Sequence, residues 1–154
     1  MKKVLALTMA LALVAASFAG CGNSSSGTST TAAATTAAAE GTGTVKIGMS
    51  GPLTGGDAIY GNAVKNAAQI AVDEINALGG IQFELNMQDD EGDPEKAANA
   101  YNKLKDWGMQ LSLVSVTTKP AEATSVNHNE DRIFGLTPSA SSMAVTEGKD
   151  NVYQ

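Results

Sequence analysis

Between residues 44 and 154, apolar positions follow two distinct periods. Alternation of apolar and polar side chains predicts half-buried strands, and short apolar runs predict strands that are buried more deeply. The segments with these patterns are residues 45–49, 81–88, 111–116 and 133–136, and the pair at 152–153, where a fifth strand could begin.

Helical spacing of apolar residues separates these segments. Residues 62–78 carry apolar side chains three and four positions apart, and Gly79 and Gly80 then end the helix. A second helix is predicted to begin with Asp93 as its N-cap and Pro94 in its first turn, and to end at Gly108. The two helices are therefore predicted to connect the first three strands.

A third, weaker helix of small residues is predicted at residues 120–126. The resulting order is strand, helix, strand, helix, strand, helix, strand, with connections long enough for crossovers. This order predicts a parallel sheet in a doubly wound α/β domain. The domain is expected to span residues 44–154, the end of the chain.

The second strand indicates the order of the sheet. It carries polar side chains on one face, at Gln82, Glu84, Asn86 and Gln88. Interior parallel strands are covered on both faces and read as continuous apolar runs, so this strand is expected at an edge. The strand order is then 2-1-3-4, and ligands in such sheets bind beyond the carboxyl ends of the strands where the order reverses.

The loops at that reversal are rich in hydroxyl groups and glycine. They are residues 50–56, 117–120 and 137–142, and the charges in or next to them are Lys119 and Asp57. The spacing of Gly51 and Gly56 resembles a phosphate loop, but Asp57 stands where the phosphate-binding lysine is needed. The loops therefore favour a neutral, polar ligand site over a phosphate site.

The N-terminal 43 residues have a different composition. Residues 1–20 combine Lys2 and Lys3 with an apolar run, as a signal peptide does; an uncleaved membrane anchor is the alternative. Residues 18–21 resemble a bacterial lipobox, in which Cys21 becomes the lipidated first residue. Residues 21–43 are mainly Ser, Thr, Gly and Ala, which predicts a disordered tether.

Charge and rare residues exclude several classes of protein. The formal net charge is −6, which argues against a nucleic-acid or anionic-membrane surface. One cysteine excludes an internal disulfide, and one histidine excludes a two-histidine metal site. No cofactor is expected. No activated nucleophile is evident, so the sequence does not support an enzyme.

Three polar features have ordinary structural interpretations. His128 lies in a polar stretch and is expected at the surface. The acidic residues 89–93 are expected to form a solvated turn, with a calcium loop as the alternative. Tyr60 follows the first strand's loop, where it either lines a ligand pocket or packs in the core.

Several motifs together resemble one known family. The chain resembles the type I periplasmic substrate-binding proteins of ABC transporters. The matching stretches are residues 47–55, Tyr60-Gly61, residues 71–81, the pattern DDxxDP at 89–94, residues 116–118 and residues 136–141. The group is that of the branched-chain amino-acid receptors, which bind leucine, isoleucine or valine. The resemblance covers the N-terminal part of such a protein only, so we expect a truncated first lobe.

The resemblance implies four ligand-binding residues. Tyr60 would line the pocket with its ring, and Thr118 would bind the ligand carboxylate through its hydroxyl and amide. Ser139 would accept the ligand ammonium at its backbone carbonyl, and Ser141 would hold both groups. No metal is implied.

The resemblance also implies a function and partners. The chain would be a lipoprotein, anchored outside the cytoplasm at the cell membrane, that captures an amino acid and delivers it to an ABC transporter permease. The alternatives are a ligand-sensing module of the same fold without a transport role, and an enzyme on a flavodoxin-like sheet. The uncharged hydroxyl loops weigh against the enzyme.

Overall fold

The computed structural model describes residues 43–154. The expected signal peptide at 1–20, the lipidation site Cys21 and nearly all of the expected tether lie outside the described residues. The strands are β1 (Thr44–Gly51), β2 (Gln82–Asp89), β3 (Leu111–Leu113), β4 (Phe134–Leu136) and β5 (Val152–Tyr153). The helices are α1 (Ala58–Ala77), α2 (Pro94–Trp107), α3 (Thr118–Asp131) and the short 3-10 helix η1 (Met143–Val145).

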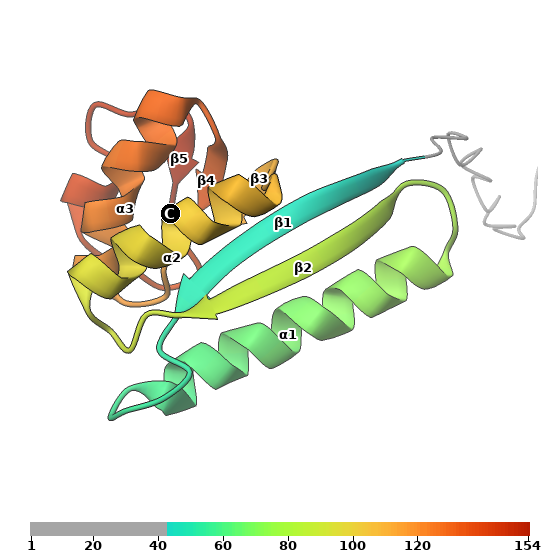
Figure 1. Ribbon diagram of the computed structural model, residues 1–154, viewed down its shortest axis with the longest axis horizontal. Coiled ribbons are helices and arrows are strands. Elements are labelled where there is room, and N and C mark those ends of the chain that lie inside the picture. Colours follow the sequence, from blue (N-terminus) through green and yellow to red (C-terminus); the bar gives the residue numbers. More distant parts are fainter. Residues whose placement is uncertain (1–42) are drawn as a thin grey trace, which may run out of the picture. The chain divides into compact units, whose positions relative to one another are not determined.

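The strands form one parallel sheet in the order β2-β1-β3-β4-β5 (Figure 1). The predicted order 2-1-3-4 is therefore confirmed, and β2 is an edge strand as its polar face indicated. β5 is the fifth strand foreseen at residues 152–153. The order reverses at β1 and β3, which places a topological switch point between their carboxyl ends.

Helices cover both faces of the sheet. α1 packs against β1 and β2, while α2 packs against α3 and against β1 and β2 (Figure 1). Right-handed crossovers explain this arrangement, because the chain moves outward from β1 to β2 through α1 and then back across the sheet through α2 and α3. The fold is the predicted doubly wound α/β domain.

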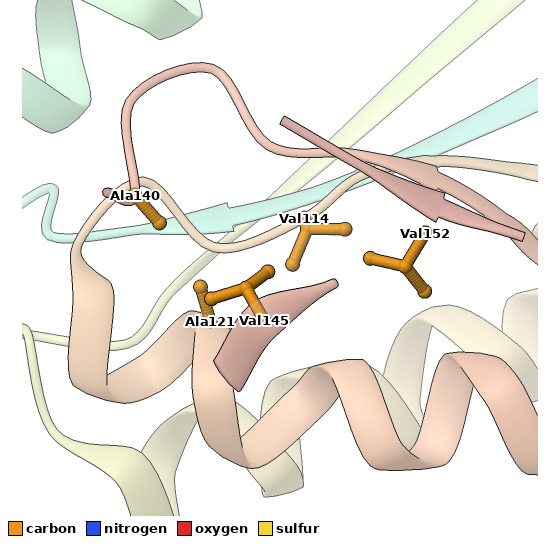
Figure 2. Close-up of a cluster of buried hydrophobic side chains, with 5 residues drawn as sticks. All are labelled: Val114, Ala121, Ala140, Val145 and Val152. Carbon is orange, nitrogen blue, oxygen red and sulfur yellow. The ribbon is translucent and has the colours of Figure 1, made fainter. Parts of the chain in front are cut away.

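Two apolar clusters hold the α2 and α3 face. One joins α3 and η1 to the sheet, and Figure 2 shows its five side chains gathered between them: Val114, Ala121, Ala140, Val145 and Val152. The other comprises Tyr101, Leu104 and Met109, with Trp107 and Ile133 packed against it. The clusters fix α3 and the segments after β3 and β4, which carry the candidate site.

The predicted ends of α2 are confirmed. Asp93 caps the helix by accepting a hydrogen bond from the Lys96 amide at 2.9 Å. Pro94 is the first helical residue, and Gly108 ends the helix in the left-handed conformation, with φ of 91°. These end signals are local, so the sequence alone places them correctly.

The third helix is longer than predicted, and the third strand is shorter. α3 spans Thr118–Asp131 because its buried face is made of small or polar side chains, such as Ala121, Thr124 and Ser125, which hydropathy does not mark as a core face. β3 pairs on both sides only over Leu111–Leu113. The chain then continues between its neighbours, since the Val114 amide donates to Leu136 O at 3.1 Å.

The expectation of a surface position for His128 is wrong. Its side chain is 2% exposed and lies edge-on to the Tyr101 ring at 4.7 Å between centroids. Its ring nitrogens are hydrogen-bonded to Thr124 O and Ser112 Oγ, both at 2.7 Å. Gly135 in β4 leaves room for the imidazole, because a Cβ there would lie 3.3 Å from His128 Cδ2.

One part of the sheet remains uncovered on the α1 side. An apolar groove of about 230 Å³ is lined by α1 and by the strands, and Phe134 and Leu136 at its wall are 46% and 43% exposed. Among residues 43–154, no helix has the length and apolar character needed to cross a membrane.

Candidate ligand-binding site

The loops after β1, β3 and β4 meet at the carboxyl edge of the sheet. The Val116 amide donates to Ser50 O at 3.3 Å, which joins the end of β1 to the segment after β3. Ser139 Oγ donates to Val116 O at 2.6 Å, which joins that segment to the loop after β4. The three hydroxyl-rich loops are therefore neighbours, as the switch-point argument requires.

Thr118 and Ser141 are in direct contact. The Ser141 amide donates to Thr118 Oγ1 at 3.4 Å, across 23 positions of sequence. Thr118 is the first residue of α3 and is half-buried, while Ser141 is exposed. The N-terminus of α3 thus carries the Thr118 hydroxyl and lies beside the Ser141 amide. This combination suits an anionic group because helix N-termini present free amides and a partial positive charge.

Thr137 shapes the loop that holds Ser139 and Ser141. Its buried hydroxyl donates to Ser115 O at 3.3 Å and accepts from the Ala140 amide at 3.1 Å. Ala140 is also part of the apolar cluster under this loop. The backbone between Ser139 and Ser141 is therefore held from below by one hydroxyl and one buried methyl group.

Tyr60 lies in the first turn of α1, and 61% of its surface is exposed. Packing in the core, one of the two interpretations of this residue, is therefore wrong. Within residues 43–154 its hydroxyl forms no hydrogen bond to Thr118, Ser139 or Ser141. The structure brings three of the four predicted residues together, and the fourth, Tyr60, lies on α1.

Asp89, the first residue of the acidic segment 89–93, is hydrogen-bonded to the loop after β1. Asp89 Oδ1 accepts from the Leu53 amide at 2.8 Å, and Asp89 Oδ2 accepts from Thr54 Oγ1 at 2.6 Å. Partial burial acts to raise the pKa of Asp89, but these hydrogen bonds outweigh it and lower the pKa. Asp89 therefore folds the loop after β1 against the end of β2.

Asp90 is fully buried, so a solvated position is wrong for this residue. Its Oδ1 accepts from the Gly92 amide at 2.9 Å. Burial raises the pKa of the carboxyl, and the hydrogen bond from the Gly92 amide offsets part of that rise. Composition alone gives no sign of this burial; the DDxxDP pattern directly after a strand is the signal that marks the two aspartates.

The chemical groups at this edge can bind a polar ligand. It offers hydroxyl groups, backbone carbonyls and helix amides, and its nearest lysine, Lys119, is exposed. Among the described residues no group of three or more His, Cys, Asp or Glu side chains is arranged to hold a metal ion. His128 is buried on α3. Its ring nitrogens are hydrogen-bonded to Thr124 O and Ser112 Oγ, and not to these loops.

Known proteins are similar to this chain in sequence and fold. A family model described as periplasmic binding protein matches residues 44–154. The Leu/Ile/Val-binding protein BraC3 of Rhizobium johnstonii is 40% identical over 112 residues, which are 70% of this chain and 30% of that protein. The leucine-, isoleucine-, valine-, threonine- and alanine-binding protein of Pseudomonas aeruginosa is 30% identical over 106 residues, or 67% of this chain and 28% of that protein.

A solved structure agrees with these relatives. The branched-chain amino acid transporter substrate-binding protein LivJ of Streptococcus pneumoniae, in complex with isoleucine, superposes with a TM-score of 0.66 at 31% identity, over 71% of this chain and 32% of that one. The chain thus spans about 30% of the length of the relatives it matches. By sequence, strand order and parallel topology, it belongs to the type I periplasmic binding proteins, in the branched-chain amino-acid group.

Proposed function

We propose that the chain is an extracytoplasmic, lipid-anchored substrate-binding lipoprotein, or a part of one, that captures branched-chain or similar amino acids for an ABC importer. It binds its ligand and does not catalyse a reaction. Thr118, Ser139 and Ser141 hold the ammonium and carboxylate groups, and the Tyr60 ring lines the pocket. The names of the relatives support this ligand class, since they bind leucine, isoleucine and valine.

The contact between Thr118 and Ser141 carries the proposal. It places the Thr118 hydroxyl and the Ser141 backbone amide together at the N-terminus of a 14-residue helix, where an amino-acid carboxylate finds hydrogen-bond donors. Acidic side chains at the same edge are occupied elsewhere: Asp89 binds the loop after β1, and Asp90 is buried. Among residues 43–154, neither of these two carboxyl groups is hydrogen-bonded to Thr118 or Ser141.

Affinity of the described lobe by itself is expected to be weak. One lobe leaves one side of the ligand in water, and each charge-assisted hydrogen bond that is not made forfeits roughly 1.5–3 kcal/mol. A tenfold change in affinity is about 1.4 kcal/mol. Two or three missing contacts therefore weaken binding by about two to six powers of ten relative to a closed two-lobe site. We expect a dissociation constant on the order of 1 mM or more.

Nuclear magnetic resonance measures binding of this strength. The full chain with Cys21→Ser, which prevents lipidation, is titrated with leucine and with isopentylamine, which lacks the carboxylate. Leucine should shift the amide signals of Thr118 and Ser141, and isopentylamine should not. Thr118→Ala should abolish the leucine shifts at Ser141, whereas Thr146→Ala, which removes an exposed hydroxyl elsewhere, should preserve them.

Two results would contradict this assignment. Equal shifts with both compounds would show that the carboxylate is not recognised. Unchanged leucine shifts in Thr118→Ala would show that the ligand lies elsewhere. Micromolar affinity of the monomeric chain would contradict the one-lobe argument.

The lipid anchor has a separate test. Cys21 is the lone cysteine of the chain and follows the apolar segment directly. Bacteria grown with labelled palmitate should incorporate label into the wild-type chain and not into Cys21→Ser. Equal labelling of the two would remove the anchor from the proposal without affecting ligand binding.

A further inference from the structure

One peptide unit of the loop after β4 carries the proposed acceptor for a ligand ammonium. It joins Ser139 to Ala140, so it contains the Ser139 carbonyl and the Ala140 N–H. No peptide bond among residues 43–154 is cis, so this unit is planar and trans. The C=O and N–H bonds of such a unit point in opposite directions, and the direction of one therefore fixes the direction of the other.

The Ala140 N–H points into the interior of the protein. It donates to Thr137 Oγ1 at 3.1 Å, and this buried hydroxyl donates in turn to Ser115 O at 3.3 Å. The Ala140 methyl group belongs to the apolar cluster beneath the loop, which Figure 2 shows. The Ser139 carbonyl, at the other side of the same peptide unit, therefore points away from this interior.

The other contacts of Ser139 agree with this orientation. Its hydroxyl is already engaged, because Ser139 Oγ donates to Val116 O at 2.6 Å. Its carbonyl oxygen accepts no hydrogen bond from residues 43–154, and the residue is exposed, as Ser141 is. The carbonyl is therefore the polar group that Ser139 presents at the carboxyl edge of the sheet.

We propose that Thr137 is a positioning residue for ammonium recognition: its hydroxyl holds the Ala140 N–H inward and so turns the Ser139 carbonyl outward to the ligand. Because hydrogen bonds polarise one another, the bond to Thr137 also makes this carbonyl a stronger acceptor. A carbonyl oxygen attracts an ammonium group and repels a carboxylate, so Thr137 acts on one end of an amino acid only. The ligand rests on the proposed function; the orientation of the peptide unit does not depend on it.

Amide hydrogen exchange tests the orientation without ligand. In the full chain with Cys21→Ser, the Ala140 amide should be protected although it lies outside the helices and strands. Thr137→Val keeps the shape of the side chain and removes the hydroxyl, so it should speed exchange at Ala140 about tenfold, the equivalent of one hydrogen bond. Thr137→Ser keeps the hydroxyl and should retain most of the protection. An unprotected Ala140 amide in wild type, or wild-type exchange in Thr137→Val, would overturn the proposal.

Thr124→Val is the matched control. Thr124 is also buried, and its hydroxyl donates to Pro120 O at 3.0 Å within α3. The same substitution there reports what loss of a buried hydroxyl does when the Ala140 amide keeps its partner. Exchange at Ala140 should equal that of wild type once any loss of global stability is taken into account. Equal acceleration in Thr137→Val and Thr124→Val would overturn the proposal, because the effect would then be one of stability alone.

Two ligands test the consequence for recognition. Leucine carries the ammonium group, and 4-methylpentanoate is the same molecule without it. In wild type, leucine should shift the carbonyl carbon signal of Ser139, and 4-methylpentanoate should not. Thr137→Val should weaken leucine binding about tenfold and leave the binding of 4-methylpentanoate unchanged. Unchanged leucine binding, or equal weakening of both compounds, would overturn the role of Thr137 in ammonium recognition.

These measurements separate the inference from the proposed function. If leucine shifts the Ser141 amide of wild type but not the Ser139 carbonyl carbon, the inference is overturned and the proposed function stands. This comparison needs no variant, so it also serves if Thr137→Val does not fold. If leucine causes no shift in wild type, the proposed function fails, and exchange at Ala140 still decides whether Thr137 sets the peptide unit.

Discussion

Gly61 lies where the first turn of α1 crosses the loop after β1, and a methyl group there would have no room. A Cβ on Gly61 would stand 1.9 Å from Pro52 O and 2.6 Å from Pro52 C. These are backbone atoms of a buried residue, so no side-chain rotation can relieve the overlap. The helix or the loop would have to move by roughly 1 Å to reach even a 3.0 Å contact.

Two opposing effects set the size of the change in Gly61→Ala. Alanine is favoured over glycine inside a helix by about 0.8–1 kcal/mol, which alone would stabilise the protein. Forcing extra atoms into a packed site costs about 1–3 kcal/mol and sometimes more. Because the overlap is with backbone atoms, we expect a cost near the upper end, about 3 kcal/mol, and so a net loss of about 2 kcal/mol in the free energy of unfolding. Each kcal/mol lowers Tm by about 4–8 °C in a domain of roughly 100 residues.

Urea and thermal unfolding followed by circular dichroism measure this loss. Gly56→Ala is the control, because Gly56 lies in the same loop region, has open space around its Cβ position and has no positive φ. It should change stability by less than about 0.5 kcal/mol. A Gly61→Ala protein as stable as wild type, or more stable, would refute the close packing of α1 on Pro52 and with it the position of Tyr60.

Three further predictions follow from the described contacts. Burial lowers the pKa of His128 below its usual 6.5. The contribution of His128 to stability is therefore complete above pH 6.5 and is lost as the pH falls from 6.5 toward the lowered pKa. Urea unfolding should show a lower free energy of unfolding at pH 5.5 than at pH 7.5 in wild type, and a smaller difference in His128→Gln. Asp93→Ala should lower the free energy of unfolding by about 1 kcal/mol through loss of the N-cap, and a loss near zero in the same assay would show that the cap is unimportant. The amides of β2 that face away from β1 should exchange with solvent faster than those of β1, and equal protection would contradict the edge position of β2.

The sequence by itself determined the order of elements, the fold class and the edge of the sheet. Alternating polar residues along β2 carry that information because an interior parallel strand has no wet face. The ends of α2 were equally local: a capping aspartate, a proline in the first turn and a glycine with positive φ each act within a few residues. The hydroxyl loops could also be placed at one edge, since the carboxyl ends of parallel strands coincide.

Tertiary structure alone decided which polar residues are buried. His128 stands in a polar stretch, yet α2 supplies Tyr101 beside it and β4 supplies a glycine that leaves it space. Asp90 belongs to an acidic turn, yet its amide donates to Gly51 O of β1 at 3.0 Å and its side chain is fully buried. The contact between Thr118 and Ser141 likewise joins separate loops. Burial of a polar group depends on partners distant in the chain, and no local pattern of residues records those partners.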